Sequence, residues 1–224
     1  QTWTEVEAVN RAIRAELARA GRLGPAANVT TYAAVDATLA QKRDPAFYAS
    51  DHCVHFVQRY GRFVKGDVCA VAGASAKGLV VVKNGRRSTV SFRYVERLAV
   101  VTPRPLDLGT GDRLQLKFNG RSTEGTPLAN GELVTVRAIA PDGRIIVAGD
   151  HGLEKTLSPA QRVFNLGYAI TSYGSQGKTV DTVLLSDSGE RAATNRNQWY
   201  VAISRARKRA LILTADKSAL RDHI

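Results

Sequence analysis

The triplet Gly177 to Thr179 is the part of this sequence that most directly suggests phosphate chemistry. It closes the stretch "SYGSQGKT" (172–179), which lies between the apolar runs "NLGYAIT" and "VDTVLL". A P-loop needs a glycine, four residues and then Gly-Lys-Ser/Thr, because the first glycine permits the turn that aims backbone N–H groups at phosphate. Ser172 occupies the position of that first glycine. We therefore expect no P-loop here, and the match needs another explanation.

Arg205 is a second candidate, in the basic segment "YVAISRARKRALIL" (200–213). Helical spacing predicts that Trp199, Ile203 and Ala206 share one buried face, with Arg205 about 200° away from Ile203. An arginine that projects from a packed helix could reach a phosphate delivered by another domain, where its planar cation stabilises charge on a γ-phosphoryl group. From the residues alone, an ordinary solvated charge is the alternative.

The charge balance favours a polyanionic partner. The chain of 224 residues has 32 Lys and Arg against 20 Asp and Glu, a formal net charge of +12. This favours nucleic acid ahead of an anionic membrane, with a basic protein that has no such partner as the alternative. No apolar run reaches the roughly 20 residues of a membrane span, and the N-terminus resembles no targeting signal, so we expect a cytoplasmic protein.

A metal site or a disulfide is not expected. Cys53 and Cys69 are far apart in the sequence and no Cys-x-x-Cys pair occurs. In "DHCVHF" (51–56), His52 and His55 would point to opposite faces of a strand, and no second pair of ligands exists elsewhere.

The strongest helical pattern covers residues 4–20. Thr4 and Glu7 form a capping box, and Gly21 follows where a C′ glycine is expected. The apolar face contains Val6, Val9, Ile13 and Leu17, and we predict a separate face with Asn10 and Arg14. Because no strand leads into this helix, we expect the chain to be a fragment of a longer protein.

A weak repeat in the middle of the chain predicts small β structures. "KGDVCAV" (65–71) matches "NGELVTV" (130–136), and glycines follow in both copies at Gly78 and Gly143. Each glycine precedes a β-rich run, "LVVV" or "RIIV", and then a further short strand, "STVSF" or "KTLSP". This pattern is typical of two small SH3-like barrels, at about residues 50–102 and 109–163.

After Phe164 the pattern favours an α/β fold. Apolar runs alternate with a helical stretch, as in a parallel sheet buried on both faces. We therefore predict a parallel α/β domain formed by residues 1–28 and 164–224, with an inserted β region at 29–163.

Two segments in this α/β part resemble a known family. "YAITSYGSQGKTVDTVLL" and "QWYVAISRARKRALILTAD" resemble motifs V and VI of superfamily 1 DNA helicases of the RecD-like branch. "GDRLQLKFNG" through "NGELVTVRAI" is similar to the small barrel inserted in their second RecA-like domain. "GSQGKTVD" and the additional first barrel are most similar to the helicase region of MobF-type (TraI/TrwC-like) conjugative relaxases. The opening "TWTEVEAVNRAIRAEL" resembles the motif IV region.

The resemblance implies roles for individual residues. Arg205 would be the arginine finger that reaches ATP on a partner domain. The nucleotide-facing residues would be Gln176, Gly177, Lys178 and, from motif IV, Arg14, with Asn10 mapped to the same motif. The residues facing single-stranded DNA would be Thr171, Ser172 and Tyr173. Many relatives have His-Lys where this chain has Tyr173 and Gly174, and an aromatic there could stack on a base.

The resemblance also implies a partner domain. ATP and Mg²⁺ would be held mainly by an upstream first RecA-like domain of the same polypeptide, because this sequence has neither a P-loop nor an acidic magnesium motif. Since hydrolysis takes place in the cleft between two such domains, we expect no ATP hydrolysis by this chain alone. The alternative is a non-catalytic module that binds nucleic acid or acts as a scaffold.

Overall fold

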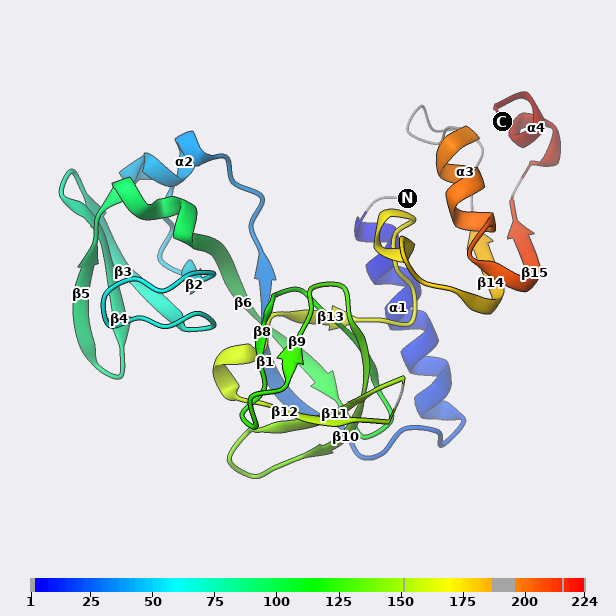
Figure 1. Ribbon diagram of the computed structural model, residues 1–224, viewed down its shortest axis with the longest axis horizontal. Helices are drawn as coiled ribbons and strands as arrows, with labels where there is room; N and C mark the ends of the chain where they lie inside the picture. The colour runs from blue at the N-terminus through cyan, green and yellow to red at the C-terminus, as the bar shows by residue number, and fades with distance from the viewer. Residues whose placement is uncertain (1–2, 151, 187–195, 215, 224) are drawn as a thin grey trace. The chain divides into compact units, whose positions relative to one another are not determined.

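The computed structural model is a mixed α/β protein and describes residues 3–150, 152–186, 196–214 and 216–223 (Figure 1). It divides into two compact units. We name Gln1–Ile13 with Tyr168–Ile224 the α/β unit and Arg14–Gly167 the β unit. The domain limits expected from the sequence, 1–28 with 164–224 and 29–163, remain a prediction.

Helix α1, Trp3–Arg19, contributes residues to both units. It begins at Trp3, so Thr4 lies inside the first turn and not at the predicted N-cap. It ends as expected: Gly21 has φ +67°, its N–H donates to Ala18 O, and Arg22 N–H donates to Leu17 O. These two bonds form a Schellman motif, which satisfies carbonyls at the helix end.

The predicted packing face of α1 is wrong in part. The buried residues in this helix are Val6 and Asn10, whereas Val9 is 43% exposed. Asn10 and Arg14 therefore lie on the packed side and not on a separate polar face. The physical reason is that both side chains have partners inside the protein, which offset the cost of their burial.

The β unit contains a six-stranded antiparallel sheet with the order β1-β6-β2-β3-β4-β5. Its strands are β1 Ala27–Ala34, β2 Cys53–Phe56, β3 Val68–Ser75, β4 Gly78–Lys83, β5 Arg86–Val90 and β6 Leu98–Leu108. Short helices lie in the connections: α2 Leu39–Arg43, η1 Pro45–Phe47 and η2 Phe92–Arg97. The core includes Phe56 and Phe63, whose rings stack 4.4 Å apart.

A second antiparallel sheet of the β unit has the order β12-β11-β10-β7-β13. Its strands are β7 Arg113–Leu116, β10 Leu133–Ile139, β11 Ile145–Gly149, β12 Glu154–Leu157 and β13 Phe164–Leu166. The strands β8 Gly120–Arg121 and β9 Pro127–Leu128 form a separate pair, and η3 covers Pro159–Gln161. Thr31 Oγ1 in β1 donates to the carbonyls of Arg162 and Phe164, which ties β1 to the segment that enters β13.

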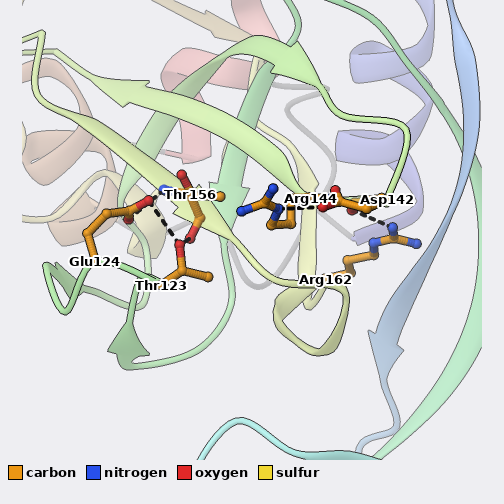
Figure 2. Close-up of polar contacts among 7 residues, drawn as sticks. Thr123, Glu124, Asp142, Arg144, Thr156 and Arg162 are labelled. Carbon is orange, nitrogen blue, oxygen red and sulfur yellow. Dashed lines mark hydrogen bonds and ion pairs between the residues drawn. The ribbon is translucent and has the colours of Figure 1, made fainter.

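Polar contacts hold the turns of this second sheet (Figure 2). Thr156 N–H donates to Glu124 (3.1 Å), and hydrogen bonds from the Thr156 side chain and backbone lower the pKa of Glu124. Arg144 N–H and Nε donate to Asp142, and these bonds, the backbone one foremost, lower its pKa. Arg162 Nη2 donates to Gly143 O (2.6 Å), where Gly143 has φ +80°.

The repeated strand pattern predicted from the sequence is present in both sheets. β3, β4 and β5 cover the first copy, and β10, β11 and β12 cover the second. The two SH3-like barrels themselves are not confirmed. Among the described residues, β5 pairs only with β4 and β12 pairs only with β11. Neither sheet therefore closes into a barrel in this part of the chain.

The α/β unit contains strands β14 Val180–Ser186 and β15 Ala206–Leu213, which pair in parallel and lie side by side in Figure 1. It also contains η4 Tyr173–Ser175, α3 Arg196–Ile203 and α4 Lys217–His223. Trp199 and Ala202 bury one side of α3.

The parallel α/β sheet, buried on both faces, that the apolar runs predicted is not confirmed. β14 and β15 form a two-stranded sheet in the described residues, and both strands are largely exposed. The run "NLGYAIT" was predicted to be a strand of this parallel sheet. Instead, β13 stops at Leu166 and pairs antiparallel with β7 in the β unit. Hydrophobicity alone could not separate these outcomes, because a short apolar run fits any sheet. Within the described part of the chain, no helix has the length and apolar character needed to cross a bilayer.

Candidate functional site

The loop at residues 171–176 is a compact turn built on η4. Gly174 N–H donates to Thr171 Oγ1 (3.1 Å), and Ser175 Oγ donates to Ser172 O (2.6 Å). Ser175 N–H donates to the carbonyls of Thr171 and Ser172. Thr171 and Ser172 are therefore half-buried and fix the turn, whereas Tyr173 projects with 68% of its surface exposed.

The segment that follows does not have the geometry of a P-loop. Gly177 has φ +74°, a conformation that other L residues rarely adopt, and open space surrounds its Cα. Gln176 and Gly177 are exposed and Lys178 is half-buried. After Thr179 the chain enters strand β14, whereas a P-loop leads into a helix. The Gly-Lys-Thr triplet thus lies at a turn before a strand.

Arg205 does not lie on a helix, which corrects the sequence prediction. α3 ends at Ile203, Arg205 occupies the following turn, and Ala206 begins β15. Arg205 Nε donates to Val201 O (3.0 Å) and Nη2 donates to Ser204 Oγ (3.0 Å). The guanidinium therefore caps a carbonyl at the end of α3, where a cation is favourable. The predicted direction of Arg205 assumed a helical rotation of about 100° per residue, but α3 ends two residues before Arg205.

The parallel pairing of β14 and β15 brings these two candidates to one edge of the sheet. Val180 N–H donates to Arg205 O (2.9 Å), and Val180 is in register with Ala206. Parallel strands begin at the same edge, so the residues before β14 and those before β15 must lie close together. Lys178 and Arg205 are 27 positions apart in the sequence. They nevertheless lie just before the first residues of two neighbouring strands, β14 and β15.

A polar contact reinforces this edge. Asp181 accepts from Lys208 Nζ (2.8 Å) and pairs with Arg207 Nη2 (2.7 Å). The hydrogen bond from Lys208, followed by the charge of Arg207, lowers the pKa of the Asp181 carboxyl. Two cations of the basic segment are therefore paired with a carboxylate of the same chain. Arg205 instead donates hydrogen bonds to a carbonyl and a hydroxyl.

The two residues mapped to motif IV both bind other parts of the protein. In the α/β unit, Asn10 Nδ2 donates to Val6 O and Ala169 O, and Ala169 N–H donates to Asn10 Oδ1 (2.8 Å). This pairing positions the segment just before Thr171. This role of Asn10 was not predicted from the sequence, although Asn10 follows Val6 by four residues and so shares its face.

Arg14 lies in the β unit and pairs with Asp112. Its Nε is 3.0 Å from Asp112 Oδ1, and the Asp112 side chain is fully buried. Asp112 Oδ2 also accepts from Gly109 N–H (2.7 Å). Arg14 thus has a structural partner, and its assignment to the nucleotide remains a prediction.

The described residues offer cations for a phosphate but no set of ligands for a metal ion. Lys178 and Arg205 provide positive charge at one edge of the α/β unit. No three His, Cys, Asp or Glu side chains gather into a metal site in the described ranges.

Comparison with known proteins shows a similarity in this part of the chain. Residues 166–213 match the UvrD-like helicase C-terminal domain family. Among solved structures, that of unliganded Pif1 from Bacteroides sp is 26% identical, over 52% of this chain and 32% of that chain, with a TM-score of 0.34. The match thus spans about a third of that structure. No curated protein matches the chain significantly.

Residues 166–213 are therefore similar to the C-terminal domain of UvrD-like helicases. This region contains the η4 loop, both parallel strands and Arg205. The two candidates found from the sequence thus lie within the same matched segment.

Proposed function

We propose that this chain is the C-terminal motor part of an ATP-dependent superfamily 1 DNA helicase, belonging to a conjugative relaxase-helicase of the cytoplasm. In this proposal an upstream first RecA-like domain holds ATP and Mg²⁺. The present chain supplies an arginine finger and contacts to single-stranded DNA. The observation that carries the proposal is the helicase C-terminal match over residues 166–213, which includes both strand-edge candidates.

The geometry of the edge supports the roles of Arg205 and Lys178. A phosphoryl group in transfer gains negative charge on its oxygens, and cations held close to it stabilise that charge. Arg205 is held by Val201 O and Ser204 Oγ at the start of β15, and Lys178 precedes β14. We propose that Arg205 contacts the γ-phosphate, and that Gln176, Gly177 and Lys178 face the nucleotide.

The η4 loop supports the DNA role. Tyr173 is exposed at the tip of a turn that Thr171 and Ser172 stabilise. An exposed aromatic side chain on a fixed turn is suited to stack on an unpaired base. Because β14 follows this loop directly, movement at the nucleotide edge would reach the DNA contact through residues 174–179.

The test uses a polypeptide in which this chain follows its P-loop domain. We expect DNA-stimulated ATP hydrolysis, and we expect Arg205→Ala and Arg205→Lys to lower kcat by about 10³-fold or more, because an arginine finger contributes that much. Arg209→Ala removes an exposed arginine from the middle of β15 and is the matched control. It should keep hydrolysis within about twofold, since it lies outside the strand edge.

Two outcomes would contradict the proposal. Unchanged turnover in the Arg205 variants would remove the arginine-finger role. No DNA-stimulated hydrolysis by the joined polypeptide would instead favour a non-catalytic nucleic-acid-binding module.

A further inference from the structure

The β unit contains a strongly basic segment that the helicase match does not include. Residues 57–97 contain nine Lys and Arg and two Asp and Glu, a surplus of seven positive charges. More than half of the formal net charge of +12 thus lies in 41 residues outside the matched range 166–213. This concentration of positive charge suggests an anionic partner for the first sheet.

The β4–β5 hairpin places like charges directly opposite each other. Its two-residue turn has φ +50° at Asn84 and +73° at Gly85, the conformation that Asn-Gly favours in hairpins. This turn sets Lys83 against Arg86 in the strand register. Opposed cations destabilise a sheet, and Asp67 offsets only one of them through its bond to Lys83 (2.5 Å). An anionic ligand would relieve the remaining repulsion.

A second arginine joins the hairpin from the loop after β2. Arg62 Nη2 donates to Arg86 O (3.2 Å), and its guanidinium lies 5.3 Å from the ring centre of Phe63. With Lys83, Asn84 and Arg86 it lines an open hollow of about 320 Å³. These contacts hold three cations around a solvent-filled space, which is a suitable site for phosphate groups.

Aromatic rings from the same loop and from η2 lie beside each other. Tyr60 is bridged to Phe63, and its ring lies 5.2 Å from that of Tyr94. The Arg97 guanidinium lies 5.0 Å from the Tyr94 ring centre, and Nη1 donates to Arg59 O. Tyr94 is 39% exposed. Aromatic rings and arginine planes are the groups on which unpaired bases stack.

We infer that this basic-aromatic surface, formed by Tyr60, Arg62, Lys83, Arg86, Tyr94 and Arg97, is a second binding site for single-stranded DNA. Arg62, Lys83 and Arg86 contact phosphates, and Tyr94 with Arg97 stacks on a base. The inference rests on the proposed function for the choice of DNA as the polyanion. Single strands fit better than duplex DNA, because the bases of a duplex are stacked on each other and cannot reach Tyr94.

The test measures binding of the whole chain to a fluorescent oligo-dT by anisotropy over a range of salt concentrations. Tyr94→Ala should raise Kd about 5- to 150-fold, as expected for loss of one stacked base, and Tyr94→Phe should restore most of the affinity. The double variant Arg62→Gln with Arg86→Gln should reduce the slope of log K against log salt by about 1.4, since each phosphate contact to a single strand contributes about 0.7.

A matched control uses two exposed cations elsewhere in the β unit. Lys77 lies in the turn between β3 and β4, and Arg137 lies in β10. Lys77→Gln with Arg137→Gln removes the same charge and should leave Kd within about threefold, because only long-range attraction is lost. Far-UV circular dichroism of each variant checks that the β unit is folded.

The outcomes separate this inference from the proposed function. If the surface variants bind oligo-dT like the control while Tyr173→Ala weakens binding, the second site is wrong and the helicase proposal stands. If a duplex of equal length competes as well as oligo-dT, the stacking role is wrong. If the unaltered chain shows no salt-dependent binding, both the second site and the DNA contacts of the proposed function are wrong.

Discussion

The β unit and the α/β unit bury their apolar side chains to very different extents. In the β unit, Phe56, Leu116 and Ile145 are fully buried among many similar neighbours. Among the described residues of the α/β unit, the buried apolar side chains are Val6, Trp199, Ala202 and Leu220. Leu184 in β14 and Leu213 in β15 are 68% and 60% exposed.

This difference shows that sequence hydrophobicity and burial are separate properties. β14 and β15 are as apolar as the strands of the β unit, yet a two-stranded parallel sheet has little to cover it in the described structure. Parallel strands are normally buried on both faces. The β unit thus has a core of its own, whereas the described strands of the α/β unit leave most of their side chains exposed.

The largest expected effect distinguishes a core residue of the β unit from an exposed leucine of the α/β unit. Phe56→Ala should lower the free energy of unfolding by about 3–5 kcal/mol, because it leaves a cavity beside Phe63. Leu184→Ala should change it by less than about 0.5 kcal/mol, because the side chain is already exposed.

Urea unfolding with two probes measures this difference. Both tryptophans, Trp3 and Trp199, belong to the α/β unit, so their fluorescence reports on that unit, whereas far-UV circular dichroism is dominated by the β unit. If Phe56→Ala shifts both transitions equally, the units unfold together and the contrast between them is lost.

A smaller effect is expected from the ion pair inside the β unit. Asp112→Ala should cost about 3 kcal/mol, because Arg14 is only 17% exposed and would be left without its carboxylate. Glu16→Ala breaks the exposed Glu16–Arg19 pair on the same helix and should cost less than about 1 kcal/mol. Chemical denaturation of both variants checks this, and equal losses would show that burial of Asp112 contributes nothing.

The smallest effect is a pH dependence from His55. Burial, with the nearby charge of Lys65, lowers the pKa of His55 to about 4, against the opposing effect of Asp67. Because the unfolded chain binds a proton near pH 6.5 and the folded chain does not, stability falls as the pH drops from about 6.5 toward 4. At pH 5 the loss should be about 2 kcal/mol.

Thermal unfolding between pH 5 and 7 measures this effect. Over this range Glu124 and Asp142, whose pKa values are lowered, remain ionised, so they add little to the slope. His55→Gln should flatten the pH dependence. An unchanged slope in that variant would assign the effect to other groups.

Local signals in the sequence predicted local features of the fold. The Gly21 end of α1 and the strands of the repeat at 65–92 and 130–159 were predicted, because a C′ glycine and period-2 alternation act over a few residues. Three features were not predicted correctly: the strand that precedes Gly167, the end of α3 and the packing of Asn10. Each depends on partners far away in the chain: Leu114, Val180 and Ala169.

The sequence by itself determined the charge, the strand-forming segments and the two motifs at 172–179 and around Arg205, since these depend only on residue type and spacing. Only the tertiary structure decided that Arg205 lies in a turn, and that this turn and the Gly-Lys-Thr segment meet at one sheet edge. It also decided that Arg62 bonds to Arg86 and that the ring of Tyr60 lies beside that of Tyr94. The physical reason is that strand pairing and side-chain contacts join residues that no local pattern connects.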